Sequence, residues 1–211
     1  MNGFIKCSVA LALISLGMLL LVSSIEIYSA NKIQRNQRNH KHTLVNHILK
    51  NLDYDALLSL QLVSAMPINL TSSVSLSSMD TIIINEERFA VLIELATNSG
   101  YNGIIKLLVA IRADGVLLGS RVIEHHETPG LGDKIESHRS NWINTFFDKS
   151  LSTVPNKDWK VKRDGGKFDQ FTGATITPRA VVTAVHLTLL FVQEHNEALF
   201  QEKISHSVVI P

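Results

Sequence analysis

Hydrophobic residues are concentrated in one uncharged run before residue 26 and are mixed with polar residues after it. From Cys7 to Ile25 no residue carries a charge, and Lys6 and Glu26 bracket the run. A helix of that length, at about 1.5 Å per residue, is about 29 Å long, close to the thickness of a hydrocarbon core. The pattern predicts an uncleaved transmembrane anchor over residues 7–25, preceded by a short cytoplasmic N-terminus, residues 1–6. A cleaved signal peptide is the alternative, but the run exceeds the roughly 7 to 15 apolar residues of such a peptide.

Polar patterning dominates the next segment, residues 26–80. Asn31 to Lys41 is basic and polar, which predicts a solvated stalk. Val45, Ile48 and Leu49 then recur at helical spacing together with Leu52, which indicates a short amphipathic helix. Pro67 to Met79 is rich in Ser and Thr and predicts a loop, with at most a short irregular strand.

Strand patterns follow from residue 81. Four runs are rich in β-branched and other apolar residues: Thr81–Ile84, Phe89–Ala96, Ile104–Arg112 and Val116–His125. Turn residues separate them, at 85–88, at Gly100-Tyr101-Asn102-Gly103 and at Asp114-Gly115, the last a strong hairpin signal. A meandering antiparallel sheet is therefore expected.

Helical patterns return after the sheet. Trp142 to Phe147 has one apolar side, whereas Trp159 to Lys162 alternates like a strand. Apolar residues then fall at helical spacing from Ala180 to about Phe200, and Thr177-Pro178 reads as an N-cap followed by a first-turn proline. The expected fold class is α+β: one membrane helix, then one domain of antiparallel strands with packed helices over residues 81–200, and a tail, residues 201–211.

Composition excludes several classes of function. The net charge is +1, and no basic stripe with interleaved aromatics indicates nucleic-acid binding. The single cysteine excludes an intrachain disulfide, a CxxC redox pair and a cysteine-ligated iron–sulfur centre within this chain. Any redox chemistry must therefore come from a cofactor that cysteine does not hold.

The run Asp169-Gln170-Phe171-Thr172-Gly173-Ala174-Thr175 is the most informative motif. It lies just upstream of the predicted helix, where free N–H groups and the helix dipole favour an anion by about 0.3–1 kcal/mol. Gly173 and Ala174 leave the backbone open to a bulky ligand. A threonine hydroxyl is a poor nucleophile without an adjacent base, so a modification here needs a separate transferase.

This motif resembles the flavinylation sequence of the FMN-binding domain family. The resemblance implies one FMN per chain, covalently linked through a phosphoester to Thr175, with Thr172, Gly173 and Ala174 beside it. It also implies that Asp169 belongs to the sequence recognised by a flavin transferase. The alternative is a plain loop and helix cap.

A second segment, Glu127-Thr128-Pro129-Gly130-Leu131-Gly132-Asp133-Lys134, can continue neither a helix nor a strand and predicts a shaped loop. The order of these segments along the chain is similar to that in the family of G subunits of the Rnf ion-translocating electron transport complexes. The resemblance implies FMN contacts from Thr128, Leu131, Tyr101 and Lys134. An ordinary hairpin aromatic and a solvated lysine remain the alternatives for Tyr101 and Lys134.

Other polar groups do not predict a catalytic or metal site. His125 and His126 are adjacent, so on a strand they point to opposite faces, and no third-ligand pattern accompanies them. Glu124, Glu127 and Asp133 are interpreted as surface or turn carboxylates. No residue is assigned a catalytic role, and no metal is expected.

The resemblance implies an electron-carrying flavoprotein rather than a self-sufficient catalyst. Its partners would be other proteins of a membrane complex that couples ferredoxin/NAD electron transfer to ion transport, the flavin transferase and the lipid bilayer. No NAD-binding Gly-x-Gly-x-x-Gly turn occurs in the chain. The family places the soluble domain on the periplasmic side of the bacterial inner membrane, although the basic residues after the anchor, Lys32, Arg35, Arg38 and Lys41, favour the cytoplasm by the positive-inside rule. Two alternatives stay open: the C subunit of a sodium-translocating NADH:quinone reductase, and a cofactor-free membrane-anchored scaffold.

Overall fold

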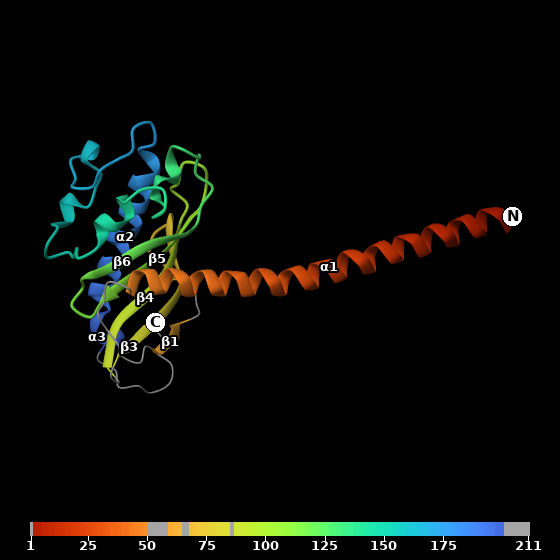
Figure 1. The fold of residues 1–211 in the computed structure, drawn as a ribbon, viewed down its shortest axis with the longest axis horizontal. Coiled ribbons are helices and arrows are strands. Elements are labelled where there is room, and N and C mark those ends of the chain that lie inside the picture. Colours follow the sequence, from red (N-terminus) through yellow and green to blue (C-terminus); the bar gives the residue numbers. More distant parts are fainter. Residues whose placement is uncertain (1, 50–58, 65–67, 85–86, 201–211) are drawn as a thin grey trace. The chain divides into compact units, whose positions relative to one another are not determined.

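The structure, a computed structural model, describes residues 2–49, 59–64, 68–84 and 87–200 (Figure 1). The α-helices are α1 (Asn2–Leu49), α2 (Ile176–Glu194) and α3 (Asn196–Phe200). The strands are β1 (Ser59–Ser64), β2 (Ile68–Asn69), β3 (Val74–Ile84), β4 (Glu87–Thr97), β5 (Ile105–Arg112) and β6 (Leu117–Glu124). Short 3₁₀ helices are η1 (Gly132–Ile135), η2 (Trp142–Phe146), η3 (Asn156–Asp158) and η4 (Lys162–Asp164). The chain divides into two compact units that meet between Thr43 and Leu44.

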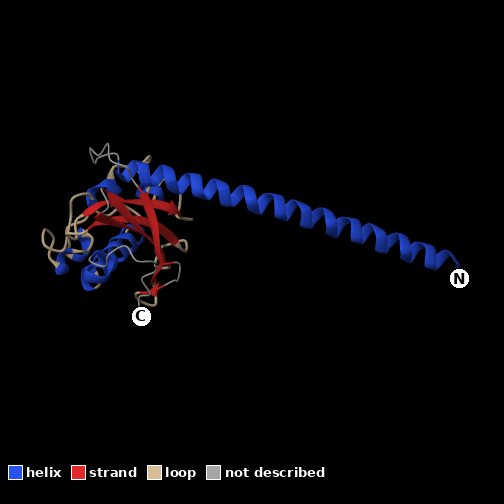
Figure 2. Ribbon diagram, turned by 90° about the horizontal axis from the view of Figure 1, so that it is seen from below, coloured by secondary structure: helices blue, strands red, loops and turns tan. Residues whose placement is uncertain are grey.

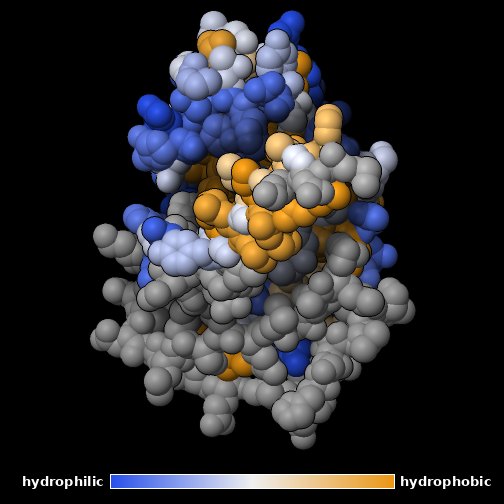
Figure 3. All heavy atoms as spheres, turned by 90° about the vertical axis from the view of Figure 1, so that its right-hand side faces the viewer, coloured by the Kyte–Doolittle hydropathy of each residue, from blue (hydrophilic) through white to orange (hydrophobic). Residues whose placement is uncertain are grey.

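The first unit is a single helix. Its apolar segment, Gly3–Glu26, is 24 residues long and no part of it is buried. Large apolar side chains such as Phe4, Leu11 and Leu19 are exposed, and Figure 3, which faces the N-terminal end of α1, shows a contiguous group of hydrophobic side chains. This is the apolar helix that the sequence predicts.

The predicted stalk and the predicted short helix are not separate elements. Residues 31–41 are helical, and Val45 and Ile48 lie in the last turns of the same helix α1. The reason is local: residues 31–49 contain neither proline nor glycine, so nothing ends the helix. Leu52 lies outside the described residues.

The second unit contains an antiparallel sheet in the order β1-β3-β4-β5-β6, with β2 paired to β3 (Figure 2). The Asp114-Gly115 turn joins β5 to β6, and Gly115 adopts φ +81°, as the hairpin signal predicts. Strand β3 begins at Val74, so among the described residues the loop predicted for the Ser/Thr-rich segment is found only at residues 70–73, after the short strand β2. Buried Val74, Leu76 and Met79 explain this difference, because they supply an apolar face between the polar residues. Part of the predicted turn at 85–88 lies outside the described residues.

Both faces of the sheet are buried. On one face, odd-numbered residues of β4 and β5 pack against α2: Val91, Ile93, Leu95, Leu107, Val109 and Ile111. On the other face, the even-numbered residues Ala90, Leu92, Leu108 and Ala110 of the same strands pack with Val45 and Ile48 at the end of α1. A Cβ at Gly119 in β6 would lie 3.3 Å from the Ile48 side chain, so glycine allows this close approach.

The segment between β6 and α2 wraps an aromatic cluster. Its rings are Trp142, Phe146, Trp159, Phe168 and Phe171. The strand predicted over 159–162 is wrong: only an isolated bridge joins Val161 to Phe168, and the alternation reflects burial of Trp159 and Val161 in the cluster. The predicted helical stretch at Trp142 is the 3₁₀ helix η2. With α2 packed on the sheet, the domain is α+β, as predicted.

Candidate functional site: a cavity beside Thr175

The motif that precedes α2 is held by side chains on both sides. The Asp169 carbonyl accepts a hydrogen bond from Trp142 Nε1 at 2.7 Å, and the Asp169 carboxylate pairs with Lys162 Nζ at 2.5 Å. Phe171 packs edge-on against Trp142, with ring centroids 5.2 Å apart. The chain then turns tightly, because the Ala174 N–H donates to the Phe171 carbonyl and Gly173 has φ +81°. These contacts fix the turn that connects the motif to α2.

Thr175 occupies the N-cap position of α2, and its side chain makes no capping hydrogen bond. The prediction that Thr177 caps the helix is wrong, since the helix already begins at Ile176. Thr177 is fully buried and its hydroxyl donates to the Glu127 carboxylate. The Thr177 hydroxyl therefore bonds to a buried carboxylate, whereas the sequence predicted that it would bond to backbone N–H groups at the helix start.

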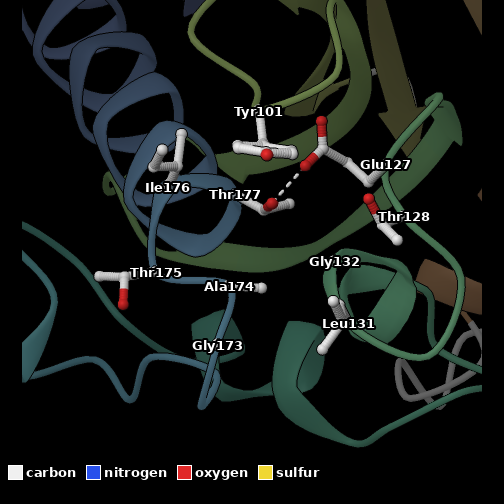
Figure 4. A pocket seen from close by; sticks show the side chains of 10 residues that line it. All are labelled: Tyr101, Glu127, Thr128, Leu131, Gly132, Gly173, Ala174, Thr175, Ile176 and Thr177. Atoms are coloured by element: carbon white, nitrogen blue, oxygen red, sulfur yellow. Dashed lines mark hydrogen bonds between the residues drawn. The ribbon is translucent and has the colours of Figure 1, made fainter.

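A cavity of about 310 Å³ opens at this point (Figure 4). Its lining comes from the turn between β4 and β5, the loop after β6 and the start of α2: Tyr101, Glu127, Thr128, Leu131, Gly132, Gly173, Ala174, Thr175, Ile176 and Thr177. Three of these side chains are apolar or aromatic yet exposed, Tyr101 at 69%, Leu131 at 42% and Ile176 at 42%. The volume lies within the roughly 300–1,000 Å³ typical of small-molecule and cofactor sites.

The loop after β6 is shaped by its own backbone. The N–H groups of Leu131 and Gly132 both donate to the Thr128 carbonyl, at 3.1 and 3.0 Å. Gly130 has φ +77°, a conformation that side chains rarely adopt. A Cβ at Gly132 would lie 2.8 Å from the Glu127 Cβ and 2.9 Å from the Thr177 hydroxyl. Glycine at 132 therefore lets the loop close onto α2.

Glu127 is the charged group at the centre of this arrangement. Its side chain is buried, with the residue only 4% exposed. One carboxylate oxygen accepts the Thr177 hydroxyl, and the other accepts the Asn102 N–H at 3.0 Å. The interpretation of Glu127 as a surface or turn carboxylate is therefore wrong. The carboxylate is stabilised there because donors from two other segments, the Asn102 N–H and the buried Thr177 hydroxyl, bond to its two oxygens.

His125 also stabilises this loop, through hydrogen bonds made by both ring nitrogens. Its Nδ1 accepts the Glu127 N–H at 3.0 Å, so the ring proton lies on Nε2, which is 2.9 Å from the Glu136 carboxylate. Among the described residues no group of three His, Cys, Asp or Glu side chains is placed to hold a metal ion. The His125-His126-Glu127 run serves hydrogen bonding within the loop.

An ion pair lies on the first turn of α2. Arg179 donates to both carboxylate oxygens of Asp164, at 2.6 and 2.9 Å. This bonding lowers the pKa of the Asp164 carboxyl and raises that of the Arg179 guanidinium. Arg179 is therefore directed at Asp164 and is not placed as a cavity-lining cation.

The structure brings together most of the residues that the sequence singles out. Thr175, Gly173, Ala174, Thr128, Leu131 and Tyr101 line the cavity. Thr172 is exposed and Lys134 is half-buried, and neither lines it. Asp169 is exposed and paired with Lys162. The sequence did not identify Gly132 and Ile176 as cavity-lining residues, nor Glu127 as a buried hydrogen-bond acceptor. The signal for Glu127 is the pair of glycines at 100 and 132, where a Cβ would clash with its side chain.

Comparison with known proteins identifies the family of this chain. Residues 100–189 match the model of the FMN-binding domain family, a span that includes every cavity-lining residue. The G subunit of the ion-translocating oxidoreductase complex of Vibrio vulnificus is 37% identical over 209 residues, which covers 97% of each chain. The corresponding G subunits of Vibrio atlanticus and Photorhabdus laumondii are 49% and 54% identical, over 58% and 54% of this chain and 58% and 55% of theirs. The chain therefore belongs to the family of ion-translocating oxidoreductase complex G subunits, with an FMN-binding domain behind an N-terminal apolar helix.

Proposed function

We propose that this chain is an electron-carrying component of a membrane-bound Rnf-type complex, with FMN linked through a phosphoester to Thr175. The observation that carries the proposal is the position of Thr175. Its side chain lines the cavity at the N-cap of α2, and no capping bond engages its hydroxyl. A phosphate on that oxygen would face the positive end of a 19-residue helix, where an anion is favoured.

The cavity fits a flavin on grounds independent of the motif. A flat, largely apolar ring needs apolar walls, and the exposed side chains of Tyr101, Leu131 and Ile176 supply them. Thr128 adds a hydroxyl at the cavity wall. Bound FMN would supply the electron chemistry, and these residues would bind and orient the ring and limit access of water to it.

Attachment needs a flavin transferase. In the transfer, the Thr175 Oγ1–phosphorus bond forms, the pyrophosphate bond of FAD breaks and AMP leaves. The hydroxyl proton must pass to a base on the transferase, since no cavity-lining His or Lys stands beside Thr175. Asp169 is exposed on the segment that leads into α2, and we assign it to recognition by that enzyme.

The test is the fluorescence of the denatured chain after co-expression with a flavin transferase. Wild type should fluoresce under ultraviolet light on a denaturing gel, and its intact mass should include one FMN. Thr175→Ala should be dark yet folded, because its hydroxyl caps nothing and its loss should cost about 1 kcal/mol at most. Thr183→Ala is the matched control and should stay bright, since Thr183 is exposed on α2, lies outside the motif and does not line the cavity. A bright Thr175→Ala with a dark Thr172→Ala or Thr177→Ala would move the attachment site, and a dark wild type would favour a cofactor-free scaffold.

We further propose that α1 anchors the chain in the inner membrane with the domain on the periplasmic side. The support is the fully exposed apolar segment of α1, Gly3–Glu26. A Cys7→Ser, Lys157→Cys chain has one exposed thiol on the domain. A membrane-impermeant thiol reagent should label it in intact cells, and labelling only after lysis would place the domain in the cytoplasm.

A further inference from the structure

We propose that Glu127 is a positioning residue of the cavity: its buried carboxylate holds the Gly100–Gly103 turn, and with it the Tyr101 ring, against the first turn of α2. The inference deepens the proposed function, since the ring positioned in this way is a wall of the FMN cavity. It concerns a residue that the motif beside Thr175 does not contain.

The first support is the pattern of hydrogen bonds. Glu127 accepts from Asn102 N–H, the backbone group directly after Tyr101, and from the hydroxyl of Thr177, one residue beyond Ile176. A second bond, from Asn102 Nδ2 to the His126 carbonyl at 2.6 Å, ties the same turn to the same loop. Tyr101 and Ile176, two exposed walls of the cavity, are thus each next in sequence to a donor of one carboxylate.

The second support is steric. A Cβ at Gly100 would lie 2.8 Å from a carboxylate oxygen of Glu127, and a Cβ at Gly132 would lie 3.0 Å from the other. Both contacts are closer than real Cβ atoms normally allow, so glycines on two sides leave the carboxylate room. The Glu127 carboxylate therefore fits in its position because residues 100 and 132 have no side chain.

The third support is what the turn lacks. Tyr101 is 69% exposed, and Ile104 after the turn is 52% exposed. Packing therefore does little to fix the ring. Figure 4 shows Tyr101, Glu127 and Thr177 gathered on one side of the cavity and Leu131 on another. Hydrogen bonds to a buried acceptor are the remaining means of holding the turn, and bonds to a charged group are the stronger kind.

Two readouts test the proposal on the full chain. The first needs no flavin: in a Thr175→Ala background, Glu127→Ala should raise hydrogen exchange of the Asn102 amide by about tenfold or more, because its acceptor is gone. The second uses the flavin-loaded chain: Glu127→Gln should shift the flavin midpoint potential to a more positive value, since a negative charge at the cavity wall opposes the addition of electrons. Flavin fluorescence should also rise if the Tyr101 ring is released from the cavity.

Asp133→Asn is the matched control, because Asp133 is a buried carboxylate in the same loop that does not line the cavity. It should leave Asn102 exchange and the potential unchanged. If Glu127→Ala does not fold, Thr177→Val provides the second variant and should loosen Asn102 less than tenfold but measurably. Wild-type exchange at Asn102 in Glu127→Ala, or a wild-type potential in Glu127→Gln, would overturn the proposal. A wild-type chain without flavin would instead refute the proposed function and leave the exchange result to decide whether Glu127 holds the turn.

Discussion

Replacing Thr177 with valine should destabilise the domain far more than the same change at Thr188. Both residues lie in α2, both are fully buried, and valine preserves their shape. The Thr177 hydroxyl donates to the buried Glu127 carboxylate, whereas the Thr188 hydroxyl, 2.9 Å from the Ala184 carbonyl, only adds to a bond that the helix already makes. The two valine variants therefore differ mainly in the hydrogen-bond partner that each one loses.

The expected magnitudes follow from those partners. Loss of a hydrogen bond to a charged group, with the carboxylate oxygen left buried, should cost about 2–3 kcal/mol at Thr177. Loss of the helix-internal bond at Thr188 should cost about 0–1 kcal/mol. With a urea m-value of about 2 kcal/mol per molar, the two midpoints should differ by about 1 M.

Intrinsic tryptophan fluorescence of the full chain in detergent measures this difference. The chain has two tryptophans. Both are buried in the domain, Trp142 at 7% and Trp159 at 2% exposure, so the signal does not report on α1. Equal midpoints for the two variants would show that the Thr177–Glu127 hydrogen bond adds nothing to stability, and the explanation of the site by that bond would fail.

Two further predictions concern the core. Burial lowers the pKa of His186, which stacks on Trp159, so the folded domain disfavours the protonated ring. The stability from the neutral ring is present above the ordinary pKa of 6.5 and is lost as the pH falls below it; the urea midpoint of wild type should therefore drop as the pH falls below 6.5, and it should drop less in His186→Gln. Gly119→Ala should cost about 1–3 kcal/mol, because Gly119 has φ +154° and the new methyl also meets Ile48, whereas Gly165→Ala, with open space around it, should cost only the backbone strain of about 1 kcal/mol. Similar urea midpoints for the two glycine variants would argue against close packing of Ile48 on β6.

The sequence predicts the elements of this fold whose signals are local. The Asp114-Gly115 hairpin depends on two residues, and the apolar runs of β4 and β5 are long enough to identify without tertiary information. The motif before α2 and the loop after β6 also come together at one cavity, as their shared turn chemistry and family order suggest.

The errors arise where long-range packing decides. Trp159 and Val161 alternate like a strand because both enter the aromatic cluster, and no neighbouring strand is needed. Thr177 carries a good cap residue type, but the cap position depends on where Glu127 becomes buried, and that carboxylate is fifty residues away along the chain. Hydropathy patterns describe single segments, so they do not reveal such pairs.

The packing of Val45 and Ile48 on the sheet has a practical consequence for producing the domain without the N-terminal apolar segment. A fragment that starts at Thr43 retains these two side chains over Ile82, Leu92 and Leu108. A fragment that starts after residue 50 lays that face open to water, and several fully buried aliphatic groups then become a sticky surface that invites self-association. The boundary of a well-behaved soluble version therefore lies inside the long helix, well before the first strand.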